Sequence, residues 1–320
     1  MAASAAAELA APQAASADDE AARAAVKQSL QAKLGADWAR VFGRSAQRKL
    51  GTDAKPPSSW HLNPPETYYP LLEAMPFWQT PSHSNRVQEA VDLLERFHPV
   101  ILAELQGLRE SALNQYRQAA GTEGRELSAD GVTTLLHDKG DWRVHYLQLE
   151  GSDTSESCRL TPKTAKIVRS ISRAAGHALF SVLDPGTHIL PHCGPCNHKL
   201  RLHLGLVIPD GRCCIRVGDQ ERSWSEGKVL VMDDAFEHEV WNDTQAQRVV
   251  LIVDIWHPDF SNAEVTYLEE TRAARRRRVD GREGAMGMEA SDAPAIEARS
   301  RPSEVCWSGR YGVTVRPTLK

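Results

Sequence analysis

The residues best suited to chemistry are two histidines, His192 and His238, which the sequence separates by several expected strands. Non-haem iron centres combine two imidazoles with one carboxylate on one face and leave positions open for other ligands. In a jelly roll, the first histidine usually belongs to an H-x-D/E motif. Here Cys193 and Gly194 follow His192, so glycine occupies the carboxylate position. The spacing of the histidines suggests an iron centre, and the missing carboxylate weakens that interpretation.

Cys193 and Cys196 form a C-x-x-C motif with three histidines nearby, which raises the possibility of a zinc site. A structural zinc site needs a second ligand pair at suitable spacing, and the adjacent Cys213 and Cys214 suit this poorly. A redox C-x-x-C of the thioredoxin type opens a helix in a βαβ unit, and no such unit is indicated here. Neither hypothesis is favoured.

Strict alternation runs through residues 199–207. Four leucines occupy one face of this expected strand, and Arg201, His203 and Gly205 occupy the other. If the second face lies inside a barrel, the arginine and histidine need an anion or a metal to offset the cost of their burial. If it faces solvent, they need no partner. The pattern alone leaves both interpretations open.

Arg248 lies ten residues beyond His238 and opens an expected strand that ends at Trp256. A guanidinium group can bind a carboxylate through two parallel hydrogen bonds, so Arg248 is well placed to hold a dicarboxylate. A surface arginine at a strand end is the alternative, and it would be preferred if Arg248 stood alone.

The elements that must position these residues are mostly short strands. From residue 177 onward, turn motifs such as Asp184-Pro185-Gly186 separate runs rich in β-forming residues. The expected strands cover residues 177–183, 187–192, 199–208, 212–217, 228–232, 236–241 and 247–256. Upstream, residues 84–104 have the spacing of an amphipathic helix, and we expect Pro99 to end one helix and to start or kink the next. This pattern predicts a mainly β double-stranded β-helix, or jelly roll, with an N-terminal helical layer packed on it.

Composition bounds the class of protein. The chain has 320 residues, a formal net charge of −4 and a pI near 6.3, so no nucleic-acid partner is expected. Six cysteines are too few for a disulfide scaffold, and we expect them to be thiols. No apolar run is long enough for a transmembrane segment, and the start lacks the features of a secretory signal. We therefore expect a cytoplasmic protein.

Three regions are expected along the chain. Residues 1–65 comprise an Ala-rich disordered start, a short helix and a Pro-rich linker; residues 66–260 form the catalytic domain; residues 261–320 form a charged, largely disordered tail. The tail contains a basic run at residues 272–278. This run is either a targeting signal or the solvated end of a helix, and the second interpretation is favoured.

Taken together, these motifs closely resemble the aspartyl/asparaginyl β-hydroxylase family. The resemblance covers about residues 65–260 and is strongest from residue 176 onward. The motifs that carry it are His188-Ile189-Leu190-Pro191-His192-Cys193-Gly194-Pro195, Leu200-Arg201-Leu202-His203-Leu204-Gly205-Leu206, Trp224 with Glu226-Gly227-Lys228, Asp233-Asp234, Phe236-Glu237-His238-Glu239-Val240-Trp241 and Asp254-Ile255-Trp256-His257-Pro258.

The resemblance implies a double-stranded β-helix enzyme that uses Fe(II), O₂ and the co-substrate 2-oxoglutarate. In this family two histidines hold the iron, and glycine occupies the third position, so Gly194 becomes support for the assignment. Carried over by motif, His192 and His238 are the catalytic metal ligands. The resemblance further implies a set of co-substrate-binding residues. These are Arg201 and His203 near the metal, Ser181 and Arg248 at the distal carboxylate, and Trp142 lining the pocket.

The resemblance also implies a substrate class, namely aspartate or asparagine side chains of a peptide or protein, hydroxylated at the β-carbon. The chain departs from the animal members at Cys193 and Cys196. We also expect it to lack their membrane anchor and helical repeats, which puts their EGF-like substrates in doubt. Two alternatives stay open. One is a related hydroxylase of a lipid acyl chain or a small molecule, and the other is a non-catalytic, cupin-like module that binds a metal or a ligand. The sequence does not predict the oligomeric state.

Overall fold

The computed structural model describes Gln28, Gln31, Ala32, Tyr69 and Ala273 and residues 72–78, 85–111, 125–127, 133–135, 137–149, 152–194 and 196–270. The chain divides into separate compact units between Phe260 and Ser261. Beyond this division, residues 262–270 are helical, in a region for which the sequence predicts a largely disordered tail. The rest of that tail, including the basic run, lies outside the described residues. The three predicted regions stay a prediction.

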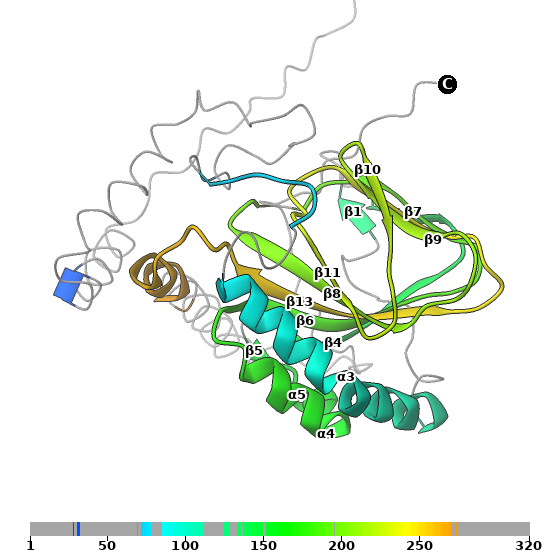
Figure 1. The fold of residues 1–320 in the computed structure, drawn as a ribbon, viewed down its shortest axis with the longest axis horizontal. Coiled ribbons are helices and arrows are strands. Elements are labelled where there is room, and N and C mark those ends of the chain that lie inside the picture. The colour runs from blue at the N-terminus through cyan, green and yellow to red at the C-terminus, as the bar shows by residue number, and fades with distance from the viewer. Residues whose placement is uncertain are drawn as a thin grey trace, which may run out of the picture. The chain divides into compact units, whose positions relative to one another are not determined.

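The described elements before Phe260 are three helices and thirteen strands (Figure 1). The helices are α3 (Asn85–Ser111), α4 (Ser155–Leu160) and α5 (Pro162–Arg169). The strands are β1 (Arg125–Leu127), β2 (Thr133–Leu135), β3 (His137–Lys139), β4 (Trp142–Leu149), β5 (Ser152–Asp153), β6 (Ala174–Leu183), β7 (Thr187–His192), β8 (Lys199–Val207), β9 (Cys213–Val217), β10 (Gln220–Ser223), β11 (Val229–Met232), β12 (His238–Asn242) and β13 (Arg248–Trp256).

Two antiparallel sheets build the barrel. The six-stranded sheet has the order β11-β8-β13-β6-β4-β5, and the five-stranded sheet has the order β10-β9-β12-β7-β3. Figure 1 shows the two sheets facing each other. Apolar side chains from both, including Leu179 and Ile252 of one sheet and Ile215 and Val240 of the other, form one core cluster between them. The predicted jelly roll is confirmed.

The helical layer covers the outer face of the six-stranded sheet. Leu94, Ile101 and Leu105 of α3 are fully buried in a second core cluster together with the leucines of β8. Because side chains alternate along a strand, burying these leucines against the helices turns Arg201 and His203 toward the barrel interior. The interior interpretation of this strand is therefore correct, and the solvent-facing one is wrong.

Helix α3 runs through Pro99 without interruption, so the expected helix end at this residue is wrong. Proline removes one backbone hydrogen bond from a helix and usually breaks it. Here the buried face continues on both sides, with Val91 and Leu94 before the proline and Ile101 and Leu105 after it. Packing of this face against the sheet outweighs the local cost of the proline.

The predicted strands agree closely with those in the structure. Strand β7 covers residues 187–192 as predicted, and β13 begins at Arg248 and ends at Trp256. Strands β1 to β5 and β10, and the helices α4 and α5 between β5 and β6, were not predicted from the sequence. The described helices include none that is long and apolar enough to cross a membrane. The five described cysteines are free thiols, as expected.

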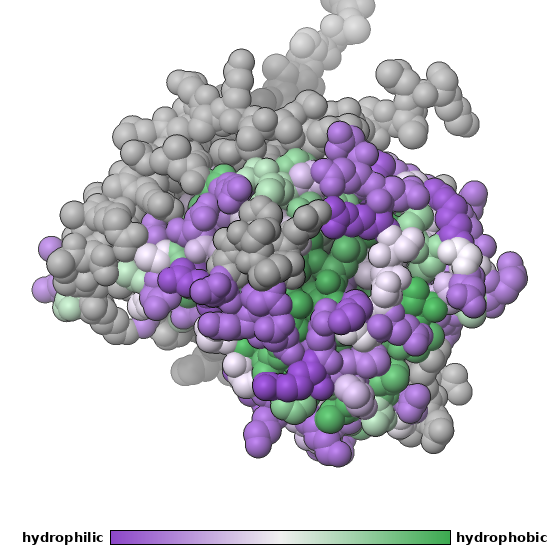
Figure 2. Space-filling view, viewed as in Figure 1, coloured by the Kyte–Doolittle hydropathy of each residue, from purple (hydrophilic) through white to green (hydrophobic). Residues whose placement is uncertain are grey.

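Hydrophilic residues dominate the face of the molecule that Figure 2 shows. Among the coloured residues, hydrophobic side chains are visible in the centre of this face and in smaller areas toward its right and lower edges, with hydrophilic residues between them. This distribution is typical of a sheet sandwich, in which each strand directs alternate residues to the core and to solvent.

Candidate active site

His192 and His238 face each other across two neighbouring strands. His192 is the last residue of β7 and His238 is the first residue of β12, and the two are register partners. Their ring centroids lie 4.1 Å apart, with an angle of 53° between the ring planes. The fold thus brings together the two residues predicted to hold a metal.

Backbone carbonyls orient both imidazoles in the same way. Nδ1 of His192 donates to the Leu190 carbonyl at 2.8 Å, and Nδ1 of His238 donates to the Phe236 carbonyl at 3.0 Å. With the proton on Nδ1, Nε2 of each ring keeps its lone pair. Burial lowers the pKa of both histidines, and their mutual repulsion lowers that of His238 further. Neutral imidazoles with oriented Nε2 atoms are the form in which histidine binds a metal.

Gly194 stands where an H-x-D/E motif has its carboxylate, and the structure leaves no room there for a side chain. A Cβ atom at residue 194 would lie 2.6 Å from the carboxyl carbon of Asp234. The Gly194 amide also donates to the Asp234 carbonyl at 2.6 Å. Among the described residues, no group of three His, Cys, Asp or Glu side chains could hold a metal ion. A metal here would therefore have two protein ligands and positions open for other molecules.

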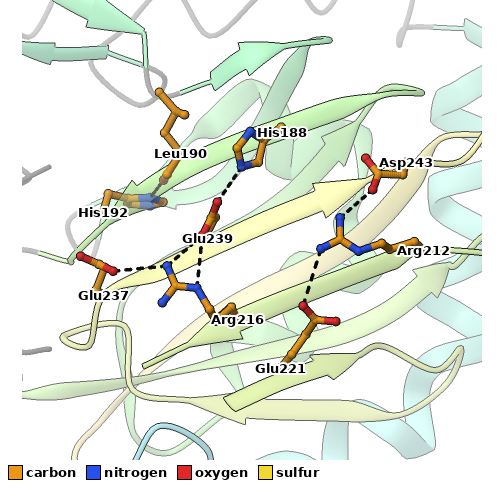
Figure 3. Close-up of polar contacts among 9 residues, drawn as sticks. All are labelled: His188, Leu190, His192, Arg212, Arg216, Glu221, Glu237, Glu239 and Asp243. Atoms are coloured by element: carbon orange, nitrogen blue, oxygen red, sulfur yellow. Dashed lines mark hydrogen bonds and ion pairs between the residues drawn. The ribbon is translucent and has the colours of Figure 1, made fainter. Parts of the chain in front are cut away.

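Charged side chains on both sides of His238 hold strand β12 in place (Figure 3). Nη2 of Arg216, on β9, lies 3.2 Å from Glu237 and 2.8 Å from Glu239. Glu239 also contacts Nε2 of His188, on β7, at 2.8 Å. These contacts tie the strand that carries His238 to both of its neighbours.

Beside the histidine pair, the six-stranded sheet presents two buried nitrogen-bearing groups, His203 and Arg248. Nε2 of His203 and Nε of Arg248 are buried and have no hydrogen-bond partner within the described part of the chain. Nη1 of Arg248 lies 3.4 Å from both the carbonyl and the hydroxyl oxygen of Ser181, and Trp142 donates to that hydroxyl at 3.0 Å. Burial lowers the pKa of Arg248 to about 10, and the group stays cationic at neutral pH. This corner of the barrel suits a carboxylate.

Arg201 is held differently. Its Nε and Nη2 donate to Asp254 at 2.8 and 3.0 Å, and Lys199 Nζ donates to the same carboxylate at 2.5 Å. Asp234 lies 3.3 Å from Lys199 and 3.4 Å from Arg201. Burial opposes ionisation of Asp254, but the charges of Arg201 and Lys199 hold its pKa well below the usual range. The contact of Arg201 with a co-substrate stays a prediction.

The sequence analysis assigned no role to Asp254, Lys199, Asp234 or Trp224. Asp254 could have been found from alternation. It lies six residues after Arg248 on one strand, and therefore on the same face. The other residues of that face, Val250 and Ile252, belong to the core between the sheets, which makes the aspartate unusual. Trp224 lies outside the strands, and no periodicity places it.

Comparison with known proteins agrees with this geometry. A sequence profile described as aspartyl/asparaginyl beta-hydroxylase matches residues 95–258. The aspartyl/asparaginyl beta-hydroxylase of Mus musculus is 39% identical over 194 residues, covering 59% of this chain and 24% of that protein. The ornithine lipid ester-linked acyl 2-hydroxylase of Rhizobium tropici is 38% identical over 169 residues, 52% of this chain and 56% of that protein.

A third relative, the human aspartate beta-hydroxylase domain-containing protein 2, is 32% identical over 212 residues, 63% of this chain and 53% of that protein. The chain belongs to the aspartyl/asparaginyl β-hydroxylase family, as the match over half of its length shows. It spans about a quarter of the mouse relative and just over half of the other two.

Proposed function

We propose that this chain is an Fe(II)- and 2-oxoglutarate-dependent dioxygenase that hydroxylates an unactivated carbon. The observation that carries the proposal is the opposed pair of His192 and His238, with both Nδ1 atoms bound to backbone carbonyls and Gly194 where an H-x-D/E motif has its carboxylate. The family to which the chain belongs supports the same assignment. Bound iron and O₂ would supply the oxidative decarboxylation of 2-oxoglutarate that is coupled to hydroxylation.

The chain's own residues bind and orient the reactants in this proposal. His192 and His238 hold the metal through Nε2, because hydrogen bonds to carbonyls occupy Nδ1. Arg248 and Ser181 bind the distal carboxylate of 2-oxoglutarate, and Trp142 fixes the Ser181 hydroxyl. His203 donates to the co-substrate near the metal. Val250 and Ile252 form apolar walls between these groups that exclude water.

The acceptor we propose is the β-carbon of an aspartate or asparagine side chain in a peptide or protein, as the name of the mouse relative states for that protein. A lipid acyl chain is the second candidate. It is favoured by the Rhizobium relative, which matches with nearly the same identity and over a larger share of its own length. The predicted cytoplasmic location is not needed for either candidate and stays a prediction.

The test is succinate formation from 2-oxoglutarate by the purified chain, with Fe(II) added anaerobically before exposure to O₂. Three samples receive no acceptor, an Asp-containing EGF-like peptide, or vesicles of an ester-linked ornithine lipid. We expect succinate formation that disappears in the His192→Ala/His238→Ala double variant. Stimulation by the peptide or by the vesicles identifies the acceptor class. Binding of Fe(II) and 2-oxoglutarate with no succinate in any sample would favour the non-catalytic module, and failure to bind either would refute the proposal.

A further inference from the structure

Trp224 contacts both His203 and Arg248, the two buried nitrogen-bearing groups of the barrel corner. It lies between β10 and β11 and is 4% exposed. Its ring lies nearly parallel to that of His203, with centroids 6.0 Å apart and 12° between the planes. The guanidinium carbon of Arg248 lies over the same indole, 4.7 Å from the ring centroid. One side chain outside the strands therefore touches two groups from neighbouring strands.

The hydrogen bond from Trp224 determines where His203 carries its proton. The indole Nε1 donates to Nδ1 of His203 at 3.2 Å. Because an indole N–H can only donate, Nδ1 must accept and must be unprotonated. Burial and the nearby Arg248 charge lower the pKa of His203 well below its usual value, which keeps the ring neutral. A neutral ring then carries its proton on Nε2, which is buried and has no hydrogen-bond partner among the residues that the structure describes.

A second tryptophan, Trp241, also lies beside a histidine and an arginine, and it shows by comparison that carboxylate partners are missing around Trp224 in the described part of the chain. On the five-stranded sheet, Trp241 is stacked on His188 at 5.5 Å and 8°, and Arg212 lies over its ring at 4.4 Å. There the arginine pairs with Asp243 and Glu221, and the histidine pairs with Glu239 (Figure 3). Both Arg212 and His188 thus have protein carboxylates as partners.

His203 and Arg248, the corresponding residues beside Trp224, have no such carboxylate partner in the part of the chain that the structure describes. Among the described residues, no carboxylate pairs with Arg248, and its closest polar contacts are the two Ser181 oxygens at 3.4 Å. The Arg248 guanidinium and the Nε2–H group of His203 are both buried beside the Trp224 indole. A bound anion would offset the cost of burying them. A carboxylate of a bound molecule would supply this partner.

We propose that Trp224 is a positioning residue for the co-substrate. Its indole N–H holds His203 in the Nε2–H tautomer, which donates to a carboxylate of 2-oxoglutarate, and its ring face holds the Arg248 guanidinium for the other carboxylate. This inference rests on the proposed function, because that function supplies 2-oxoglutarate as the bound dicarboxylate. The indole itself touches neither the metal ligands nor the acceptor in this assignment.

The first test is spectroscopic and uses the metal-free chain labelled with ¹⁵N-histidine. Long-range ¹H–¹⁵N spectra distinguish the two neutral tautomers, and loss of one signal set in His203→Gln assigns His203. We expect the Nε2–H tautomer in the wild type and a mixture of tautomers in Trp224→Phe, which keeps a ring but lacks the donor. A wild-type His203 in the Nδ1–H form would overturn the proposal, even if the variant did not fold.

The second test measures 2-oxoglutarate binding by calorimetry to protein loaded with Mn(II). Loss of one hydrogen bond predicts a Kd about fivefold to tenfold higher in Trp224→Phe. Removal of the ring face as well, in Trp224→Leu, predicts a Kd higher by about thirtyfold. The Mn(II) affinity stays unchanged in both variants, because His192 and His238 are intact. The matched control is Trp241→Phe, which should bind 2-oxoglutarate as the wild type does.

The outcomes separate this inference from the proposed function. Wild-type protein that binds no 2-oxoglutarate would refute the proposed function. Wild-type protein that binds it, together with an unchanged Kd in Trp224→Phe, would overturn only the role of Trp224. Equal weakening in Trp224→Phe and Trp241→Phe would also overturn it, since a general loss of packing would then explain the effect.

Discussion

His192 and His238 are register partners on antiparallel strands, with ring centroids 4.1 Å apart. Strand β7 ends at His192 and the antiparallel strand β12 begins at His238, so the pair lies at the same end of these two strands. Because both Nδ1 atoms are bound to carbonyls of their own chain segments, neither ring can rotate without losing a hydrogen bond. The pair is therefore oriented before any metal binds.

Replacing one of the two ligands should abolish metal binding. We expect His238→Ala to lower the affinity for Mn(II) by at least about a hundredfold and to eliminate succinate formation, because only two protein ligands are available. Calorimetry under anaerobic conditions measures the affinity. His98→Ala, on the outer helix α3, is the control and should bind Mn(II) normally. Normal metal affinity in His238→Ala would show that the ligand assignment is wrong.

A side chain at residue 194 should destabilise the fold. The new Cβ of Gly194→Ala would lie 2.6 Å from the Asp234 carboxyl group, which is buried and cannot move freely. We expect a loss of about 1–3 kcal/mol in the free energy of unfolding, measured by urea denaturation. Gly107→Ala provides a control of opposite sign. It lies on an exposed part of α3 with nothing within 4 Å of the new Cβ, and should stabilise the chain by about 0.5–1 kcal/mol. A stable Gly194→Ala protein would contradict the steric argument.

Arg248→Met should raise the stability of the ligand-free protein and at the same time weaken the binding of 2-oxoglutarate. The buried guanidinium lacks a carboxylate partner among the described residues, so an apolar chain of similar length should stabilise the ligand-free protein by about 1 kcal/mol. The same change removes the cation for the distal carboxylate, and 2-oxoglutarate should no longer raise the Tm. Arg216→Met, which breaks two ion pairs, should lower stability by about 2 kcal/mol. Thermal unfolding with and without 2-oxoglutarate checks all three expectations.

His145 should contribute to acid sensitivity. Burial lowers its pKa from 6.5 to about 4, so between these values the unfolded chain binds a proton that the folded protein does not. Stability is therefore fully present above about pH 6.5 and decreases as the pH falls toward 4. At pH 4.5 this loss amounts to about 2–3 kcal/mol. His145→Phe, which keeps a ring against Phe180, should remove that part of the pH dependence. Urea denaturation at pH 7 and pH 4.5 measures it, and an identical pH dependence in both proteins would contradict the assignment.

Much of the fold was predictable because strands carry a local signal. Alternation along residues 199–207 and the apolar run from Arg248 to Trp256 each define one strand and its two faces. Pro99 shows the limit of local rules, since a buried face that continues on both sides kept the helix intact. Strand β3 was missed because it is short and polar, whereas β4 was missed although Trp142, Val144 and Tyr146 alternate with polar residues along it.

The sequence by itself determined the residue types of the site, the family and the strand that carries each of the two histidines. It also placed His203 and Arg201 on one face of β8. Only the tertiary structure decided that Arg201 donates to Asp254 and that Trp224 donates to Nδ1 of His203. It also decided that no carboxylate among the described residues pairs with Arg248. The physical reason is that these contacts join segments far apart in the chain. Their distances depend on strand register and on how the two sheets pack, and neither is encoded in a local pattern.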